Sequence, residues 1–410
     1  MSAIHSNVKR FFGSYLTLLA ATPLVELLAG TSLLVTYILF GYRLLLLLIA
    51  LRYVRTVPGF WRPARQHLIL PVLYVVFFLI TTIFGVDLEY SIRYRAYFMP
   101  TLVVDFFLWY VAGRLFDERH YLSLVYILTG IFGALSISFS FIGLVDSEAT
   151  RVIYGPDMPI AIAAAVLCSN WVVVLGLMLV ALASIKKTVV ICAAIAVTTV
   201  AGLRWIYGAP GWARDQISPG KAFPAFVVLL LLILYIDTAW PLIEETVGRM
   251  LVEREDFYRL AMTEEFFRLL DVYFPWGAGY YTFGFLTSDI IPYTTFTADG
   301  TELGDGMSLH NTAMHALLEG GLAVSVVLIL LYFRAFRCIY QMFKRKPLRG
   351  LAIVLLAWVL VCIAYGMLNQ LHATRYYFGV LGYVIGCHWR YFSGVGQTNA
   401  IDASRASSLK

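Results

Sequence analysis

The residues best suited to chemistry in this chain lie together, where a polar stretch meets an apolar one. His310 and Asn311 stand side by side, Glu319 follows eight positions after Asn311, and a Gly-Gly pair comes next. Histidine exchanges protons near neutral pH, so His310 could act as a base, or it could be a solvated loop residue. Asn311 is placed to cap the helix that follows or to orient the histidine.

His315 is the second histidine of this stretch. It precedes Glu319 by four positions, which places both side chains on one face of a helix. We expect a local hydrogen bond between them. The His-Glu-x-x-His spacing of zinc proteases is absent, and the sequence predicts no metal site.

Two further elements lie upstream of the histidines. The stretch "PWGAGYYTF" contains Gly277 and Gly279, whose spacing predicts a turn, and Arg268 precedes Gly277 by nine positions. Arg151 begins the stretch "RVIYGPDMP". Each arginine is either a functional charge or a side chain that reaches from an apolar segment to the membrane interface.

Composition identifies the surroundings of these residues. Of the 410 residues, 60% are hydrophobic and 14% are charged, and the mean hydropathy is +0.78. Water-soluble domains of this length are not so apolar, so we predict an all-α polytopic membrane protein. The net charge of +6 is assigned to basic loops on one membrane face rather than to nucleic-acid binding. The five cysteines indicate neither a disulfide framework nor a zinc site.

Apolar segments of about 20 residues, enough to cross a bilayer, predict 11 to 12 transmembrane helices. The basic loops 51–67 and 343–350 are expected in the cytoplasm, which puts His310 and the loop 145–158 in the periplasm. Three segments then separate loop 145–158 from the long loop 241–310, an odd number for two loops on one face. Either a crossing is hidden, for example in 204–223, or one segment is not a full span. The eleven candidates are 11–30, 32–51, 68–86, 98–114, 121–144, 159–184, 188–203, 222–240, 311–334, 351–367 and 376–389.

Four regions are expected along the chain. The long loop combines a stretch with apolar residues at spacings of three and four, typical of an amphipathic helix, and a Gly- and Thr-rich stretch typical of irregular structure. Irregular backbone this close to a membrane usually lines a cavity. The regions are a transmembrane bundle at 1–240, the large periplasmic loop at 241–310, C-terminal transmembrane helices at 311–390 and a cytoplasmic tail at 391–410.

Four charges lie inside apolar segments, where each costs on the order of 3 kcal/mol. They are Glu26, Arg43, Asp105 and Asp237. Each is expected to have a partner or to face a water-filled cavity. Such charges could also line an ion or proton path, so a secondary transporter or lipid flippase is an alternative function.

Taken together, the motifs resemble the signature of the O-antigen ligase and polymerase family of membrane glycosyltransferases. In that family a Gly-x-Gly turn precedes a His-Asn pair that opens a helix, and an acidic residue and a glycine follow about two turns later. The corresponding residues are Gly277, Gly279, His310, Asn311, Glu319 and Gly320. Arg268 is similar to an arginine that the family carries ahead of the turn.

The resemblance extends upstream. Arg151, Gly155 and Pro159 are similar to a second motif, but Met158 and Pro159 stand where the family usually shows Pro-Asn. A third element of the family is a basic residue at the periplasmic end of a middle helix. Its alternatives here are Arg204, Lys186, Lys187 and Lys221.

The resemblance implies transfer of a glycan from an undecaprenyl diphosphate carrier to a sugar hydroxyl, at the periplasmic face of the bacterial inner membrane. Arginine pairs with diphosphate oxygens and histidine accepts the hydroxyl proton, so neither a cofactor nor a metal is implied. The residues implied to be catalytic are His310, Arg151 and Arg268. Those implied to bind substrate are Asn311, Glu319, Gly277, Gly279, Arg204 and Lys186.

The acceptor distinguishes two activities that share this signature. A polymerase joins the glycan to a second carrier-linked glycan, and its partners would include a flippase and a chain-length regulator. A ligase joins it to the lipid A core. We favour a polymerase of O-antigen or exopolysaccharide. Besides a transporter or flippase, a structural subunit of an export complex stays an alternative, and for such a subunit His310 would be dispensable.

Overall fold

In the computed structural model, the described residues are 6–14, 33–56, 59–93, 99–116, 162, 174, 187–207, 255–287, 309, 311–368 and 375–392. Across these ranges all regular structure is helical and no strand occurs, so the predicted all-α class is confirmed for this part of the chain. The elements are α2 (Leu33–Thr56), α3 (Trp61–Ile83), α4 (Leu88–Arg93), α5 (Pro100–Leu115), α10 (Lys187–Tyr207), α14 (Glu255–Tyr273), α15 (Thr282–Thr287), α16 (Thr312–Leu318), α17 (Gly321–Lys344), the 3-10 turn η2 (Lys346–Leu348), α18 (Arg349–Leu368) and α19 (Arg375–Phe392).

Three helical segments in the described ranges are long and apolar enough to cross a membrane. They are Trp61–Ile83, Gly321–Lys344 and Lys346–Met367, and a shorter apolar helix covers Ile191–Tyr207. Their outer faces carry large apolar side chains such as Ile80, Ile329 and Phe333, which lipid can cover. These helices support membrane association. The full number of predicted spans stays a prediction.

The closest helix pair is α5 with α19. A Cβ atom on Gly382 would overlap the carbonyl oxygen of Phe106, and one on Gly386 would overlap that of Tyr110. Gly113 on α5 is equally close to the α19 backbone. The spacing Gly382-x-x-x-Gly386 is the small-residue pattern that lets membrane helices pack backbone against backbone. These glycines therefore set the distance between the two helices.

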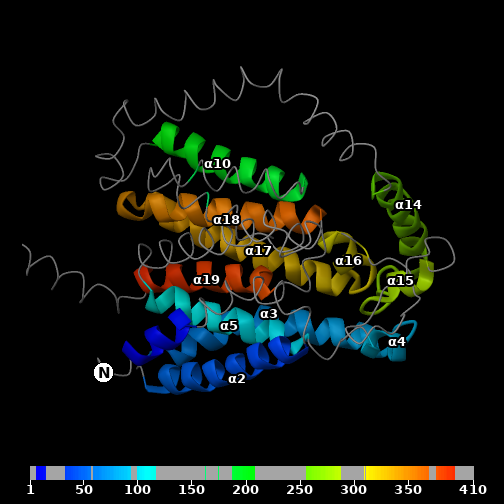
Figure 1. Ribbon diagram of the computed structural model, residues 1–410, viewed down its shortest axis with the longest axis horizontal. Coiled ribbons are helices and arrows are strands. Elements are labelled where there is room, and N and C mark those ends of the chain that lie inside the picture. Colours follow the sequence, from blue (N-terminus) through cyan, green and yellow to red (C-terminus); the bar gives the residue numbers. More distant parts are fainter. Residues whose placement is uncertain are drawn as a thin grey trace, which may run out of the picture.

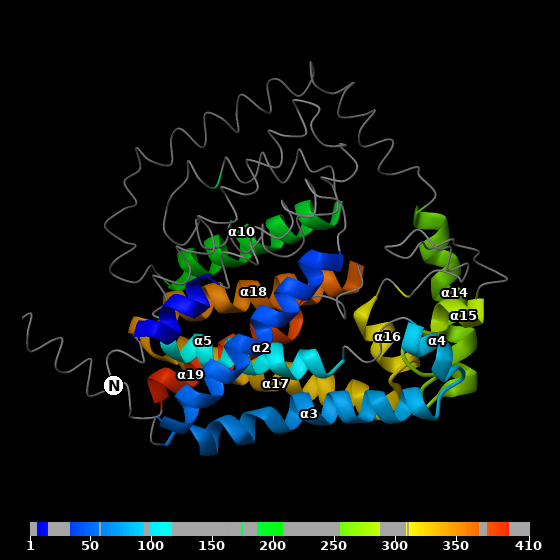
Figure 2. The ribbon, with the colours of Figure 1, turned by 60° about the horizontal axis from the view of Figure 1, so that its bottom comes forward.

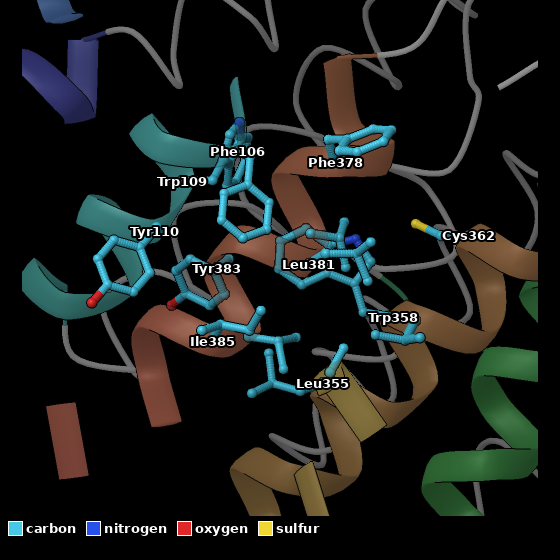
Figure 3. Packing of buried hydrophobic residues seen from close by; sticks show 14 of the residues in the cluster. Phe106, Trp109, Tyr110, Leu355, Trp358, Cys362, Phe378, Leu381, Tyr383 and Ile385 are labelled. Atoms are coloured by element: carbon cyan, nitrogen blue, oxygen red, sulfur yellow. The ribbon is translucent and has the colours of Figure 1, made fainter. Parts of the chain in front are cut away.

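Aromatic rings fill the space beside this contact (Figure 3). Trp109 of α5, Trp358 of α18 and Tyr383 of α19 meet with ring centroids 5.6 to 6.3 Å apart. The pairs are edge-on or tilted, the geometries that the charge distribution of aromatic rings favours. This cluster joins the N-terminal helix α5 to the two C-terminal helices.

The two basic loops lie at the same end of the bundle, here named the basic end. Arginine side chains at this end contact aromatic rings and carbonyl groups of neighbouring segments and so hold the regions 51–67 and 343–350 against α5 and α19. These contacts are Arg114 over the Phe60 ring, Arg390 with the Phe116 carbonyl, and Arg345 with the Tyr391 carbonyl. The prediction that both loops occupy one face is consistent with this arrangement.

The opposite end is formed by short helices and loops. Figures 1 and 2 both show α4, α14, α15 and α16 gathered there, beyond the ends of the long helices α3 and α17. The chain after α3 is joined to the segment after α14 by a hydrogen bond from the Val86 N–H to the Ala278 carbonyl, 2.9 Å long. We name this the junction end.

Helix α10 runs antiparallel to α18, beside which it lies in Figure 1. Cys192 contacts the Val361 carbonyl, and Arg349, at the basic end, donates to the Tyr207 carbonyl. The predicted crossings 121–144 and 159–184, and the segment 204–223, lie wholly or mostly outside the described residues, so the parity of the crossings stays a prediction.

One buried charge pair crosses between α2 and α5. Arg43 Nε lies 3.5 Å from Asp105 Oδ1, and Asp105 is only 1% exposed. The expectation that Arg43 and Asp105 have partners is confirmed. Glu26 and Asp237 lie outside the described residues.

The α5–α19 contact generates a first prediction. Gly386→Val places a branched side chain against the α5 backbone, and overpacking of this kind typically costs about 1–3 kcal/mol, so the unfolding temperature in detergent should fall and aggregated protein should increase. Gly202→Val is the matched control, because Gly202 on α10 has open space around its Cβ position. Equal thermal stability of both variants would contradict the glycine-mediated contact.

Candidate functional site

The Gly-x-Gly turn is bound directly to the helix that follows His310. The Ala278 N–H donates to the Leu318 carbonyl at 2.8 Å, and the Gly279 N–H donates to the Glu319 carbonyl at 3.0 Å. Gly277 and Gly279 adopt φ values of 93° and 105°, which other residues rarely adopt. Motif residues about 40 positions apart thus form one hydrogen-bonded unit.

Glycines allow the two segments to come this close. A Cβ on Gly277 would lie 2.7 Å from the Gly321 nitrogen, and one on Gly321 would meet the Pro275 and Trp276 carbonyl oxygens. The Leu322 N–H donates to the Pro275 carbonyl at 2.9 Å. The predicted single helix 311–334 is therefore divided into α16 and α17, because the turn occupies the space at Gly320–Gly321. His310 precedes the seven-residue α16 and not the span itself.

The Glu319 carboxylate is the centre of this unit. Glu319 is fully buried, and its carboxylate accepts hydrogen bonds from the Tyr281 N–H and, at 3.2 Å, from the Phe283 N–H. His315 Nε2 lies 2.8 Å from the same carboxylate, so the two side chains meet on one helix face as their spacing predicted, and the predicted hydrogen bond between them stays a prediction. Charge-assisted bonds to backbone N–H groups are stronger than neutral ones. They fix the loop onto α16. Direct contact of Glu319 with substrate stays a prediction.

Aromatic rings enclose His315. The rings of Phe78, Tyr280 and Tyr281 lie with centroids 5.4, 5.7 and 6.2 Å from the imidazole. Burial raises the pKa of Tyr280 well above its ordinary value, and the neighbouring Tyr281 and Glu319 raise it further. The Tyr280 phenol is therefore neutral at physiological pH, and it adds no charge beside the buried carboxylate.

A third segment, at the end of α3, completes the unit. The Tyr280 N–H donates to Thr82 Oγ1 at 3.2 Å, and Ser91 Oγ donates to the Tyr280 carbonyl at 2.7 Å. Gly85 faces the Ala278 carbonyl so closely that a Cβ there would overlap it. We call the whole assembly of residues 82–91, 275–287 and 311–322 the junction. Sequence analysis missed the first of these segments, although Gly85 directly after a span was a signal of close backbone approach.

The residues on either side of His310 are held firmly. Leu309 is 1% exposed and belongs to an apolar cluster with Phe266 of α14 and Leu318 of α16. Asn311 caps α16, because its side-chain oxygen accepts from the Ala313 N–H at 2.9 Å and the Met314 N–H at 3.2 Å. The predicted capping function of Asn311 is confirmed. His310 itself lies outside the described residues.

Arg268 lies on α14, the helix that packs on α16 through that apolar cluster. Its side chain is exposed, and its Nε is 2.7 Å from Glu265 Oε2, one turn away. Exposed pairs at this spacing contribute less than about 1 kcal/mol, so the guanidinium can exchange this partner for another anion. α14 falls within the stretch 241–310, where an amphipathic helix was predicted.

The structure does not bring Arg204 to the junction. Arg204 lies in the last turn of α10, and the neighbouring Tyr207 contacts Phe343 and Arg349 at the basic end. Helix direction explains the difference, because the sequence could not show which end of α10 faces the long loop. Arg151 and Lys186 lie outside the described residues.

Apolar side chains are exposed where the junction meets the ends of α3 and α17. Phe84 and Trp276 are 83% and 82% exposed, and Phe274 and Leu322 are exposed as well. Aromatic rings in such positions favour the boundary between lipid tails and headgroups. The exposed rings lie beside α14, at the ends of the long apolar helices α3 and α17.

The Glu319 contacts generate a second prediction. Glu319→Gln substitutes an amide that cannot accept both backbone N–H groups as a carboxylate does, so one buried N–H loses its partner at a cost of about 1–3 kcal/mol. Amide hydrogen exchange of peptides covering Tyr281 and Phe283 should become at least tenfold faster, as measured by mass spectrometry. Asp271→Asn, an exposed carboxylate on α14, should leave exchange unchanged. Unaltered exchange in Glu319→Gln would show that the carboxylate does not hold the loop.

Comparison of the chain with protein-family models gave no match, and comparison with curated proteins gave none. What the junction does has therefore to be inferred from its own contacts and from the resemblance of its motifs.

Proposed function

We propose that the protein is a membrane glycosyltransferase that moves a glycan from undecaprenyl diphosphate to a sugar hydroxyl at the junction end. The observation that supports this most strongly is the convergence of Gly277, Gly279 and Glu319. The resemblance groups these residues by motif alone, and the hydrogen bonds of the junction bring them together across about 40 positions. Spatial convergence of separate motif elements is expected of a functional site.

The reaction assigns His310 the role of base. The acceptor oxygen attacks the sugar carbon that is bonded to the carrier diphosphate, and the bond from that carbon to the diphosphate oxygen breaks. His310 accepts the hydroxyl proton, and the diphosphate leaves with the electron pair of the broken bond. The buried Leu309 and the cap at Asn311 restrict where the His310 side chain can lie.

The arginines bind the diphosphate. Arg268 carries an exposed, planar guanidinium next to the junction, and its weak pairing with Glu265 can be replaced by phosphate oxygens. Arg151 is proposed to be the second arginine. Positive charge near the departing oxygen stabilises the negative charge that develops there, so the mechanism requires no metal.

Glu319 and His315 act in this proposal as positioning residues. Both are fully buried, and their partners are the backbone of the Gly-x-Gly loop and the rings around it. They hold the loop that forms one wall of the site. The acceptor is proposed to be a second carrier-linked glycan, which makes the enzyme a polymerase. A ligase acting on the lipid A core is the alternative.

Transport is less well supported by the described residues. A transporter carries its polar groups near the middle of the membrane. The apolar helices α2 and α5 contain the charges Arg43 and Asp105, which are largely buried. These two charges pair with each other. The polar contacts concentrate at the junction end instead.

A third prediction tests the base. His310→Ala should lower the rate of glycan transfer by roughly 10²–10⁴, the usual range for one general base, with unchanged expression and membrane insertion. Asn311→Ala should lower it less, because it removes a cap worth about 1 kcal/mol. The assay uses the purified protein with a lipid-diphosphate glycan. Activity should persist in EDTA. Wild-type turnover by His310→Ala, or loss of activity in EDTA, would refute the mechanism.

A fourth prediction tests which face carries the junction. In a cysteine-free variant, Asp271→Cys on the exposed side of α14 should react in intact cells with a membrane-impermeant thiol reagent. Pro347→Cys, exposed at the basic end, should react only after the cells are lysed. The reverse labelling pattern would place the junction in the cytoplasm, where it could not use a periplasmic glycan.

A further inference from the structure

A second group of polar residues lies at the basic end, far from the junction. Arg114 of α5 and Arg334 of α17 share the neighbours Tyr110 and His67. The Arg114 guanidinium also packs over the Phe60 ring at 4.0 Å. Within the described ranges, neither guanidinium forms an ion pair with a carboxylate. Two partly buried positive charges thus share the same neighbours, Arg114 in the last turn of α5 and Arg334 within α17.

The hydrogen bonds of His67 show that one of its ring nitrogens lacks an acceptor. Arg334 Nη2 lies 2.5 Å from His67 Nδ1, and because a guanidinium can only donate, Nδ1 must accept. The imidazole is then neutral and carries its proton on Nε2. His67 is 8% exposed, and Nε2 has no hydrogen-bond partner among the described residues. A buried N–H donor therefore lacks an acceptor.

Two other buried nitrogen atoms near His67 also lack a hydrogen-bond partner. Arg114 Nη1 is buried without a partner in the described part of the chain, while the Arg114 side chain also interacts with the Tyr110 hydroxyl. His388 Nε2 on α19 is a second buried nitrogen without a partner there. Both groups are close enough to His67 for their charges to act on it. In Figure 3 the Tyr110 hydroxyl is directed away from the packed rings of Trp358 and Tyr383. Buried polar groups of α3, α5 and α19 thus lie around His67, and within this group the Tyr110 hydroxyl can accept a hydrogen bond from only part of them.

We propose that the basic end binds a phosphate-bearing anion at this position. Its oxygens accept hydrogen bonds from Arg114 Nη1 and His67 Nε2, and its charge balances Arg114 and Arg334. A phosphate group fits because its several oxygens can serve donors from different helices at once, and because guanidinium groups match its geometry. Phosphates concentrate at the membrane surface, where the basic end lies, as headgroups of anionic phospholipids. Free phosphate has the same chemistry.

The site is independent of glycan transfer. It uses residues of α3, α5, α17 and α19 at the end of the bundle opposite the junction, and none of them belongs to the proposed mechanism. Asp117 and Glu118 follow α5 in the sequence and lie outside the described residues, so the test must include them as competing sources of negative charge.

The experiment measures thermal unfolding of the purified full chain in a neutral detergent. Four additions are titrated: phosphatidylglycerol, phosphatidylcholine, sodium phosphate, and sodium chloride at matched ionic strength. An anion that binds only the folded protein raises the unfolding temperature with a saturable dependence on concentration. Phosphatidylglycerol should do so and phosphatidylcholine should not. If sodium phosphate has the same effect, the bound anion is free phosphate rather than a lipid headgroup.

Three variants identify the residues. Arg114→Gln should raise the half-saturating anion concentration at least about tenfold, the effect of losing one charge-assisted hydrogen bond. His388→Phe should raise it severalfold while retaining the stacking on Phe392, so it reports on binding even if Arg114→Gln folds poorly. Arg65→Gln removes an equal charge from an exposed position near the same end and should behave as the wild type.

Three outcomes would overturn the proposal. The first is that neither phosphatidylglycerol nor phosphate raises the unfolding temperature of the wild type. The second is that Arg114→Gln, His388→Phe and Arg65→Gln all retain the wild-type response. The third is that only a variant with Asp117→Asn and Glu118→Gln responds, because those carboxylates would then already neutralise the arginines.

Discussion

The arrangement of the junction end depends on one buried side chain, that of Glu319. The Glu319 carboxylate accepts hydrogen bonds from the backbone of Tyr281 and Phe283 and contacts His315, and water has no access to it. A buried carboxylate without such donors would be strongly destabilising, so the loop and the helix can only be stable together. The glycines at 277, 279 and 321 allow the loop to approach the helix closely, and the hydrogen bonds of the carboxylate hold it there. The position of α14, and with it Arg268, follows from the loop.

The two ends of the bundle differ in how their buried polar groups are paired. At the junction, backbone N–H groups of the Gly-x-Gly loop donate to the Glu319 carboxylate and to the carbonyls of Leu318 and Glu319, which holds the loop in place. At the basic end, the described donors exceed the acceptors around His67, which is the condition of a binding site rather than of a closed core. Between the ends, polar groups are few. Arg43 and Asp105 meet as a pair, and glycine contacts take the place of larger side chains along α5 and α19.

The sequence predicted features within one or two helical turns well, and it predicted poorly which way each helix runs in the bundle. The all-helical class, the cap at Asn311 and the contact between His315 and Glu319 all depend on spacings within one or two helical turns, where sequence distance and spatial distance agree. The break at Gly320–Gly321 depends on a loop 40 positions away, so hydropathy alone predicted one continuous helix. Arg204 was one of four alternatives for a basic residue at the periplasmic end of a middle helix, and hydropathy could not choose among them because it does not encode helix direction. The cluster around His67 combines residues from four helices, so no pattern within one stretch of sequence could have predicted it.

The pairing of α5 with α19 constrains how the protein is made. Gly113 and Gly386 are roughly 270 positions apart, and at about 5–20 residues per second the ribosome needs on the order of 15–50 seconds to synthesise the chain between them. During that time α5 has entered the bilayer without the helix that its glycine face fits. Lipid or the insertion machinery must cover this face until α19 is made, whereas Asp105 can already meet Arg43 of the earlier helix α2. The final architecture is therefore established late in biogenesis, and loss of the C-terminal helix would leave the first half of the bundle without its closest partner.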